Sequence, residues 1–374
     1  MRIEQIFFSL VKLGIGTANG DYEHDLLLGL SMEQWKSVMG LAEKQGVAAI
    51  VFDGVQRLYD SHGKEIKAAK HQYAEWMQWV LTCTGMMRLY EQRSLAQRRV
   101  IAELADIWAK ENIRMMVFKG QANASLYPKP EHRATGDIDC FLFGEAEKGD
   151  AVMQKHGATI DNSWYRHSKI LFKGETIENH RVMSHTRGSR KKKAMEEELV
   201  CLAKQAREEC VECGKALRPS AQYNACFLTY HGMHHFLTEG LRMKQIVDWA
   251  MFLKEEQGEV DWPAYNGFCK CYQLDKFAAV MNYIATRYLG VDDNLNVDDN
   301  DNLNVKELAE RVLRSTLYDD DYLFNSGKSN WQVRYLLVKN MLVRDRWKYR
   351  DIAQQNVWRH LFEQAKGFLL KEEE

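Results

Sequence analysis

Apolar side chains recur at helical spacing throughout residues 1–110. The first group is Ile3, Ile6, Phe7, Leu10 and Val11. Ser31 with Gln34 has the pattern of a capping box and predicts a helix start, and Gly46 predicts the end of that helix. Residues 66–110 predict one long or once-broken helix, whose apolar stripe is typical of a core and not of a ligand groove.

The apolar runs become short in the middle of the chain, as they are in strands. They predict strands at residues 115–118, 136–143, 164–172 and 176–184, of which 136–143 is expected to be central. Residues 147–155 have helical spacing and predict a crossover helix. Gly174 separates the last two segments, which are therefore expected to pair antiparallel.

From about residue 215 the pattern is helical again. Helices are expected at residues 221–237 and 241–254, with Gly240 between them. Basic and aromatic residues over 331–368 predict further helices that pack on the body with one charged face. The pattern indicates an α+β fold with three regions: helical 1–110, a core with strands at 111–215, and helical 216–374.

Two aspartates precede an apolar segment in the stretch Gly136-Asp137-Ile138-Asp139. Because side chains alternate along a strand, Asp137 and Asp139 point to the same face. Paired carboxylates repel each other unless a cation lies between them. Mg²⁺ is the expected ion, since it takes oxygen ligands and commonly uses one or two carboxylates plus substrate phosphates. The alternative is a pair of exposed aspartates at a strand end.

Lys119-Gly120 lies between a predicted strand and a short helical segment that Pro128 ends. This arrangement could direct backbone N–H groups and one ammonium group at an anion. Arg133 would add a charge-assisted contact to phosphate. The alternative is an ordinary strand-to-helix turn that needs a glycine.

These motifs together resemble a known family. The matching segments are Lys119-Gly120, Leu126-Tyr127-Pro128, Arg133 and Gly136-Asp137-Ile138-Asp139. They are similar to the uncharacterised bacterial branch of the nucleotidyltransferases, in the DNA polymerase β-type superfamily. The resemblance runs from about residue 30 to about residue 255. It implies a small mixed sheet with helices, two acids on one strand and a third acid on a neighbouring strand.

The resemblance also implies roles for particular residues. The expected catalytic and metal-binding residues are Asp137, Asp139 and Glu178. They would hold two Mg²⁺ ions, with Mn²⁺ as the alternative ion. The expected nucleotide-binding residues are Lys119, Gly120, Arg133 and Gly136. The acceptor pocket is expected at His180, His231, His235, Arg242 and Asp248.

The chain departs from the superfamily at one motif. A Gly-Ser or Gly-Gly pair usually opens a helix before the acids and holds the nucleotide phosphates. This chain has Lys119-Gly120-Gln121 instead, with Gly120 seventeen residues before Asp137. Lys119 and Arg133 would therefore supply most of the positive charge that faces a triphosphate.

Several polar clusters have a second interpretation. The spacing of His231 and His235 also suits metal ligands, but no glutamate lies between them as in H-E-x-x-H, so we favour residues that line a cleft. Arg242 and Asp248 could instead form structural ion pairs. The basic run 185–193 adjoins three glutamates, which favours a solvated helix start over a contact with RNA.

Two further motifs are not expected to bind metal. Cys210-x-x-Cys213 and Cys269-x-Cys271 lie 56 residues apart, too far for the paired motifs of a zinc site. The Asp- and Asn-rich stretch 290–305 lacks the central glycine and spaced acids of a calcium loop, so it is expected to be a solvated loop.

Composition limits the partners. The net charge of −1 gives no global field that would recruit nucleic acid or an acidic membrane. No apolar run approaches the roughly 20 residues of a membrane span. The first residues, MRIEQIFFSLVKLG, indicate an amphipathic helix and not a signal peptide, so the cytoplasm is the expected location.

The sequence thus predicts a Mg²⁺-dependent nucleotidyltransferase. It would move a nucleoside monophosphate from a nucleoside triphosphate such as ATP to a hydroxyl of a small molecule or protein. One alternative is a non-catalytic nucleotide-binding or interaction protein on the same fold, against which the three acids argue. The other is an RNA-acting transferase that uses the Arg190–Lys193 run, against which the net charge argues. The acceptor and the oligomeric state are not predicted.

Overall fold

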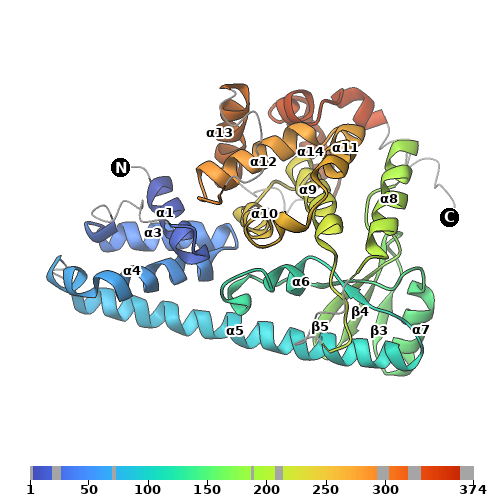
Figure 1. Cartoon of the computed structure of the whole chain (residues 1–374), viewed down its shortest axis with the longest axis horizontal. Coiled ribbons are helices and arrows are strands. Elements are labelled where there is room, and N and C mark those ends of the chain that lie inside the picture. The colour runs from blue at the N-terminus through green and yellow to red at the C-terminus, as the bar shows by residue number, and fades with distance from the viewer. Residues whose placement is uncertain are drawn as a thin grey trace.

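The computed structural model describes residues 3–18, 27–69, 73–186, 189–206, 214–292, 303–318 and 330–362. Its α+β fold is the one expected from the sequence, with a mixed five-stranded sheet and many helices. The long helix α5 (Tyr73–Lys110) runs along one edge of the molecule and joins the N-terminal helices to the sheet (Figure 1). Among these residues, no helix is both long and apolar enough to cross a membrane.

The N-terminal helices are α1 (Ile3–Ile15), α3 (Met32–Lys44), α4 (Ala48–Ala69) and α5. The predicted helix start at Ser31 is confirmed. The Ser31 hydroxyl accepts a hydrogen bond from the Gln34 backbone N–H, and the Gln34 side chain accepts one from the Ser31 backbone N–H. Gly46 has a φ of +70° directly after α3, which is the predicted end of that helix.

Glycine allows α1 and α4 to pack backbone against backbone. A Cβ atom added at Gly14 would lie 2.0 Å from the carbonyl oxygen of Ile50. One added at Gly54 would lie 2.1 Å from the carbonyl oxygen of Leu10. No side chain fits at either position, so these two residues set the distance between the helices.

The sheet has the strand order β1-β2-β5-β4-β3. Its strands are β1 (Met116–Val117), β2 (Ile138–Phe141), β3 (Thr159–Asp161), β4 (His167–Phe172) and β5 (Glu175–His180). β2 and β5 are parallel, and the other neighbouring strands are antiparallel. The expected pairing of the last two strands across Gly174 is confirmed.

The prediction that residues 136–143 form the central strand is wrong, because β5 occupies that position. The cause is β3, which the sequence did not reveal. This edge strand has only three residues and one apolar side chain, Ile160, so its alternation is too short to signal a strand. Its presence beyond β4 moves the centre of the sheet to β5.

Helices cover one face of the sheet. The C-terminal half of α5 and helix α7 (Ala146–Lys155) bury their apolar side chains against Ile138, Cys140 and Ile177. The opposite face carries Asp139, Glu178 and His180, because side chains alternate along β2 and β5. This second face turns toward the helices that follow the sheet.

The helices between and after the strands complete the fold. The short segments near β2 are α6 (Gly120–Ala124) and the 3₁₀ turn Pro130–His132. After the sheet come α8 (Arg190–Ala203), α9 (Ala221–Leu237), α10 (Met243–Glu256), α11 (Trp262–Tyr272), α12 (Asp275–Arg287), α13 (Leu303–Tyr318), α14 (Asn330–Leu342) and a π-helical turn at Lys348–Ile352. One apolar core joins helices α8 to α13 and the π-helical turn to the N-terminal helices.

Some predicted features lie outside the described residues. These are Cys210 and Cys213, most of the Asp- and Asn-rich stretch (293–302), residues 187–188 of the basic run, and residues 363–368 of the C-terminal segment. The three regions 1–110, 111–215 and 216–374 stay a prediction.

A buried ion pair ties the loop before β2 to α10. The Arg133 guanidinium donates to both carboxylate oxygens of Asp248, from Nε to Oδ1 at 2.8 Å and from Nη2 to Oδ2 at 2.7 Å. The Tyr127 hydroxyl donates to the same Oδ1 at 2.6 Å. Burial opposes both charges, yet Asp248 raises the pKa of Arg133, and Arg133 lowers the pKa of Asp248.

We therefore expect Arg133→Met to destabilise the fold by about 3–5 kcal/mol, because it leaves the buried Asp248 carboxylate unpaired. Adding Asp248→Asn should recover part of this loss, since asparagine removes the charge and keeps an acceptor for Tyr127. Chemical denaturation measures both changes. The exposed pair Lys36–Glu75 supplies the control, and Lys36→Met should cost no more than about 1 kcal/mol. A similarly small loss in Arg133→Met would contradict a structural role for the buried pair.

Candidate active site

The parallel pairing of β2 with β5 brings the predicted acids to one place. Asp139 on β2 lies directly opposite Glu178 on β5. Asp137 immediately precedes the first residue of β2 and is exposed. Asp137 and Asp139 are two positions apart, with Ile138 between them, so both side chains project from the same face. Asp137, Asp139 and Glu178 are therefore neighbours, as the sequence predicted, while their chemical roles stay a prediction.

The three carboxylates differ in their electrostatic surroundings. Partial burial and the negative charges of Glu178 and Asp139 raise the pKa of Asp137. Burial also opposes the charge of Asp139, but the Lys119 ammonium and His180 outweigh it and lower the pKa of Asp139. The pKa of Glu178 is lowered against burial by its hydrogen bond with His180. Asp137 is thus the acid whose charge is least compensated.

Lys119 is the cation that lies against the acids. Its Nζ donates to Asp139 Oδ1 at 2.7 Å, and 14% of its side chain is exposed. The aromatic rings of Phe118 and Phe227 lie 5.2 and 5.8 Å from the same Nζ. The contact to Asp139 uses only Oδ1, as does the contact from His180. Within the described part of the chain, no hydrogen bond reaches Oδ2 of Asp139, so that oxygen is available to a ligand.

The backbone of Lys119 is strained. Its φ of 59° and ψ of −139° lie in a region that glycine adopts readily and residues with side chains rarely do. The Lys119 ammonium group contacts the Asp139 carboxylate while its backbone is strained. Strained residues of this kind cluster at functional sites. Gly120 and Gly136 border this position. Gly120 begins α6, which is only five residues long, and the carbonyl oxygen of Gly136 accepts a hydrogen bond from Gln97 Nε2.

Arg133 and Asp248 meet in one buried ion pair. Arg133 was expected to face the triphosphate, and Asp248 to line the acceptor pocket. These two roles stay predictions, and a ligand at either residue would have to compete with the ion pair. The structural ion pair to another element that was considered for Asp248 exists, with Arg133 as its partner. Arg242 is exposed at the start of α10.

Histidines surround the acids on the side of α9. His180 Nε2 lies 2.9 Å from Asp139 Oδ1. On α9, the Nε2 atoms of His231 and His235 lie 3.1 Å apart. Burial, and then the nearby Lys119 ammonium, lower the pKa of His231 well below its ordinary value. His180 thus shares Asp139 Oδ1 with Lys119, and the charge of Lys119 also acts on His231.

The sequence did not reveal a second group of residues beside these histidines. The His185 and His234 rings are 4.2 Å apart, and the Tyr165 hydroxyl lies 3.2 Å from His185 Nδ1. An Arg166 guanidinium N–H also contacts His185. On β4, His167 pairs directly with His180 on β5. In this hairpin Phe172 pairs with Glu175 next to the turn at Gly174, and five pairs further on His167 pairs with His180. The contact between the two histidines could therefore have been predicted by counting residues from the turn.

The chain is thus an α+β protein whose mixed sheet carries clustered carboxylates on one face. The model of the family described as uncharacterised nucleotidyltransferase matches residues 31–290, more than two thirds of the chain. The chain belongs to this family, and the resemblance found in the sequence is confirmed. No curated protein and no solved structure matches the chain.

The strain at Lys119 can be measured with two variants. Lys119→Gly and Lys119→Met both remove the ammonium group, but only glycine relieves the backbone. We expect Lys119→Gly to be more stable than Lys119→Met by about 1 kcal/mol in chemical denaturation. Equal stability of the two variants would show that the backbone at this position is unstrained.

The buried histidines make stability depend on pH. Burial and the Arg166 guanidinium lower the pKa of His185 to about 3. In the unfolded chain a histidine binds a proton near pH 6.5, whereas folded His185 stays neutral down to about pH 3. The stability that neutral His185 gives the fold is therefore complete above about pH 6.5. It is lost as the pH falls toward 3, because the unfolded state binds the proton. The free energy of unfolding should fall by up to about 1.4 kcal/mol per pH unit for this residue.

Denaturation at about pH 7 and pH 5 tests this dependence. His185→Gln should reduce the slope, while His156→Gln, at an exposed histidine, should leave it unchanged. An unchanged slope in His185→Gln would contradict the assignment.

Proposed function

We propose that this chain transfers a nucleoside monophosphate from a nucleoside triphosphate to a hydroxyl group of an acceptor, with Mg²⁺ as the metal. One observation carries the proposal. Asp139 and Glu178 face each other on parallel strands, with Asp137 beside them, in a chain that belongs to a nucleotidyltransferase family. Members of this class use such acids to hold divalent ions against substrate phosphates.

The residues present fit that ion. Asp137, Asp139 and Glu178 would hold it, and their oxygen atoms are the ligands that Mg²⁺ prefers. The repulsion that raises the pKa of Asp137 is uncompensated negative charge, which a cation would relieve. Mg²⁺ usually keeps one or two carboxylates and takes its other ligands from phosphates and water, so the three acids need not converge beforehand. When bound, Mg²⁺ would polarise the α-phosphate and assist the ionisation of the acceptor hydroxyl.

The side chains of the chain itself supply charge and a proton acceptor. In the transfer, the acceptor oxygen bonds to the α-phosphorus, the bond between that phosphorus and the oxygen bridging to the β-phosphate breaks, and pyrophosphate leaves. Lys119 would stabilise the negative charge on the phosphates. The hydroxyl proton would pass to a carboxylate. Glu178, which lies directly opposite Asp139 on β5, is the proposed acceptor of this proton.

The acceptor would lie on the α9 side of the acids. His180, His231 and His235 remain the residues proposed to line its pocket, with Arg242 at the exposed rim. The lowered pKa of His231 keeps that imidazole neutral near pH 7. A neutral imidazole donates and accepts hydrogen bonds without adding charge, which suits a polar hydroxyl-bearing acceptor.

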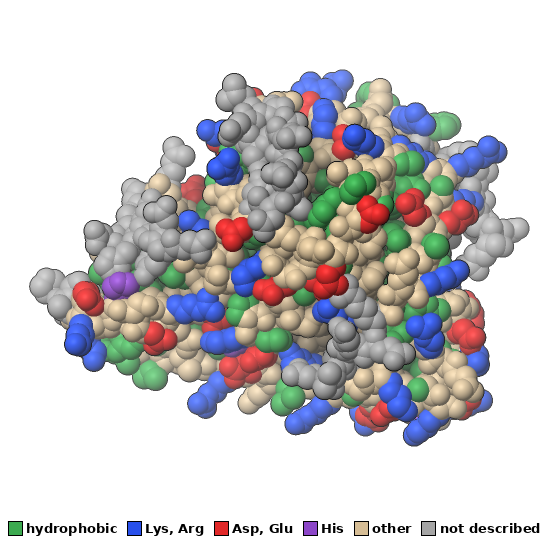
Figure 2. Space-filling model, viewed as in Figure 1, with side chains coloured by type: hydrophobic (Ala, Val, Ile, Leu, Met, Phe, Trp, Pro, Cys, Tyr) green, Lys and Arg blue, Asp and Glu red, His purple; other side chains and the backbone are tan. Residues whose placement is uncertain are grey.

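Two other functions are less well supported. A protein that binds RNA through its charge would present an extended basic surface. On the face shown in Figure 2, basic and acidic side chains of the described residues are interspersed over the helices and the sheet. A non-catalytic nucleotide-binding protein would have little use for an uncompensated carboxylate such as Asp137.

Calorimetry with a non-hydrolysable nucleoside triphosphate tests the site. The wild-type chain should bind the nucleotide more tightly with Mg²⁺ than without it. Asp137→Asn should lose this gain while its stability stays equal or rises slightly, because a repulsion between like charges is removed. Asp161→Asn, at an exposed aspartate of β3 in the same sheet, is the matched control and should keep the gain. An undiminished effect of Mg²⁺ in Asp137→Asn would place the metal elsewhere.

A further inference from the structure

We propose that His167, Glu178 and His180 form a binding site for a divalent transition-metal ion. Among the described residues, they are the one group of three potential ligands whose ligand atoms all lie within 4.8 Å of one another. Only Glu178 belongs to the three acids predicted to hold Mg²⁺. The proposal stands on the geometry of these three side chains and does not depend on nucleotide transfer.

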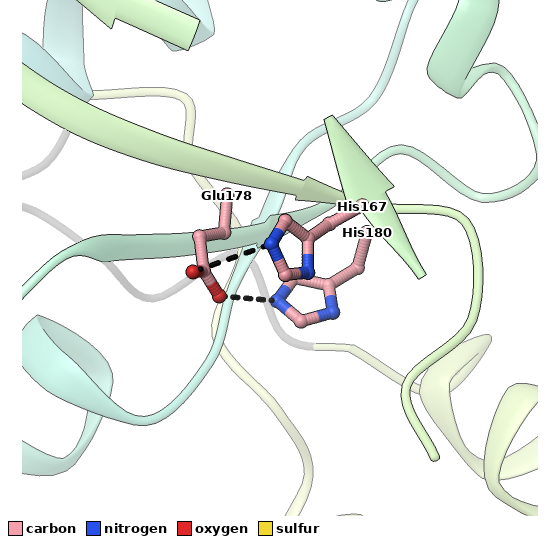
Figure 3. Close-up of side chains that lie close together, drawn as sticks. All are labelled: His167, Glu178 and His180. Carbon is pink, nitrogen blue, oxygen red and sulfur yellow. Dashed lines mark ion pairs between the residues drawn. The ribbon is translucent and has the colours of Figure 1, made fainter. Parts of the chain in front are cut away.

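The three side chains converge from two neighbouring strands (Figure 3). His167 on β4 and His180 on β5 are directly paired, and Glu178 lies two residues before His180 on the same face. His167 Nε2 is 3.4 Å from Glu178 Oε1, and His180 Nε2 is 3.5 Å from Glu178 Oε2. Ligands about 2.1 Å from a tetrahedral ion are separated by about 3.4 Å, so both distances suit a shared ion.

His167 lacks the partners that a buried imidazole needs. It is 7% exposed, and neither ring nitrogen makes a hydrogen bond within the described residues. The Trp164 ring lies nearly parallel to the imidazole, at an angle of 14°. A buried polar group without a partner costs about 1–3 kcal/mol, which a bond from Nε2 to a metal ion would offset. The Nε2 atom of His167 already lies 3.4 Å from Glu178 Oε1.

His180 is oriented in the same way as many metal ligands. Its Nδ1 lies 3.3 Å from the carbonyl oxygen of Val182, which can only accept, so Nδ1 carries a proton. Metal-binding histidines commonly donate their second ring N–H to such a carbonyl. Nε2 then faces the carboxylate oxygens of Asp139 and Glu178, at 2.9 and 3.5 Å.

Two imidazoles and one carboxylate select the kind of metal. Imidazole nitrogen suits Zn²⁺, Cu²⁺, Fe²⁺ and Ni²⁺, whereas Mg²⁺ prefers oxygen ligands. Three protein ligands also leave a coordination position open, as in catalytic zinc sites. Asp139 borders this position, so an ion there would lie next to the proposed nucleotide site and could take an oxygen atom of a substrate.

Zn²⁺ competition against a chromophoric chelator tests the proposal on the metal-free full chain. The wild type should bind one Zn²⁺ ion, and an excess of Mg²⁺ should not displace it. His167→Gln should weaken Zn²⁺ binding by more than about a hundredfold, beyond the ten- to hundredfold effect of residues that only support a ligand. His156→Gln, at an exposed histidine, is the control and should bind as the wild type does.

Two further measurements separate the alternatives. Co²⁺ bound to the wild type should give the intense visible absorption of a four-coordinate ion, and a weak six-coordinate spectrum would overturn the proposal without any variant. A loss of Zn²⁺ binding in His235→Gln but not in His167→Gln would also overturn it, because the ion would then lie at His231 and His235. Asp137→Asn should keep the Zn²⁺ site even if it abolishes Mg²⁺-dependent nucleotide binding, so failure of either proposal is recognised separately.

Discussion

The parallel pairing of β2 with β5 is the constraint on which the site depends. Its register sets Asp139 directly against Glu178, although 39 residues separate them in the sequence. α7, β3 and β4 form the connection that makes this pairing parallel. A shift of one residue would turn Glu178 to the opposite face, where the sheet packs on α5 and α7. Apolar residues such as Ile138 and Ile177 therefore fix the positions of the acids by occupying that buried face.

The balance of charge follows from this pairing. Three carboxylates share one face, and within the described structure Lys119 and the histidines compensate Asp139 and Glu178 better than Asp137. Lys119 reaches Asp139 only from a strained backbone, so the fold gives up stability to keep an ammonium group at the acids. The Arg133–Asp248 pair is buried close to the site, since the charge of Asp139 also contributes to the raised pKa of Arg133. Carboxylates, an ammonium group and imidazoles thus lie together in one site. The carboxylates and imidazoles are potential metal ligands, and the ammonium group of Lys119 could pair with a phosphate.

The sequence predicted most helices and the acids, because both depend on local patterns. The capping box at Ser31 and the alternation around Asp137 and Asp139 are visible within a few residues. β3 was missed because a strand of three residues with one apolar side chain gives too short a pattern. The partners of Arg133 and Asp248 could not be predicted, since 115 residues separate them and either charge could equally have faced a ligand. His167 was missed because its contact with His180 follows only from the register of the β4–β5 hairpin, which has to be counted from the turn at Gly174.

Transfer of label from a nucleoside triphosphate tests the central claim most directly. The chain would be incubated with Mg²⁺, cell extract and ATP labelled either at the α-phosphate or at the γ-phosphate. Our account predicts that an acceptor becomes labelled from the α-position and not from the γ-position, and that no transfer occurs without the divalent ion. Transfer of the γ-label would indicate a kinase. Tight Mg²⁺-dependent binding of ATP with no labelled product would indicate a nucleotide-binding protein, and either result would contradict nucleotidyl transfer.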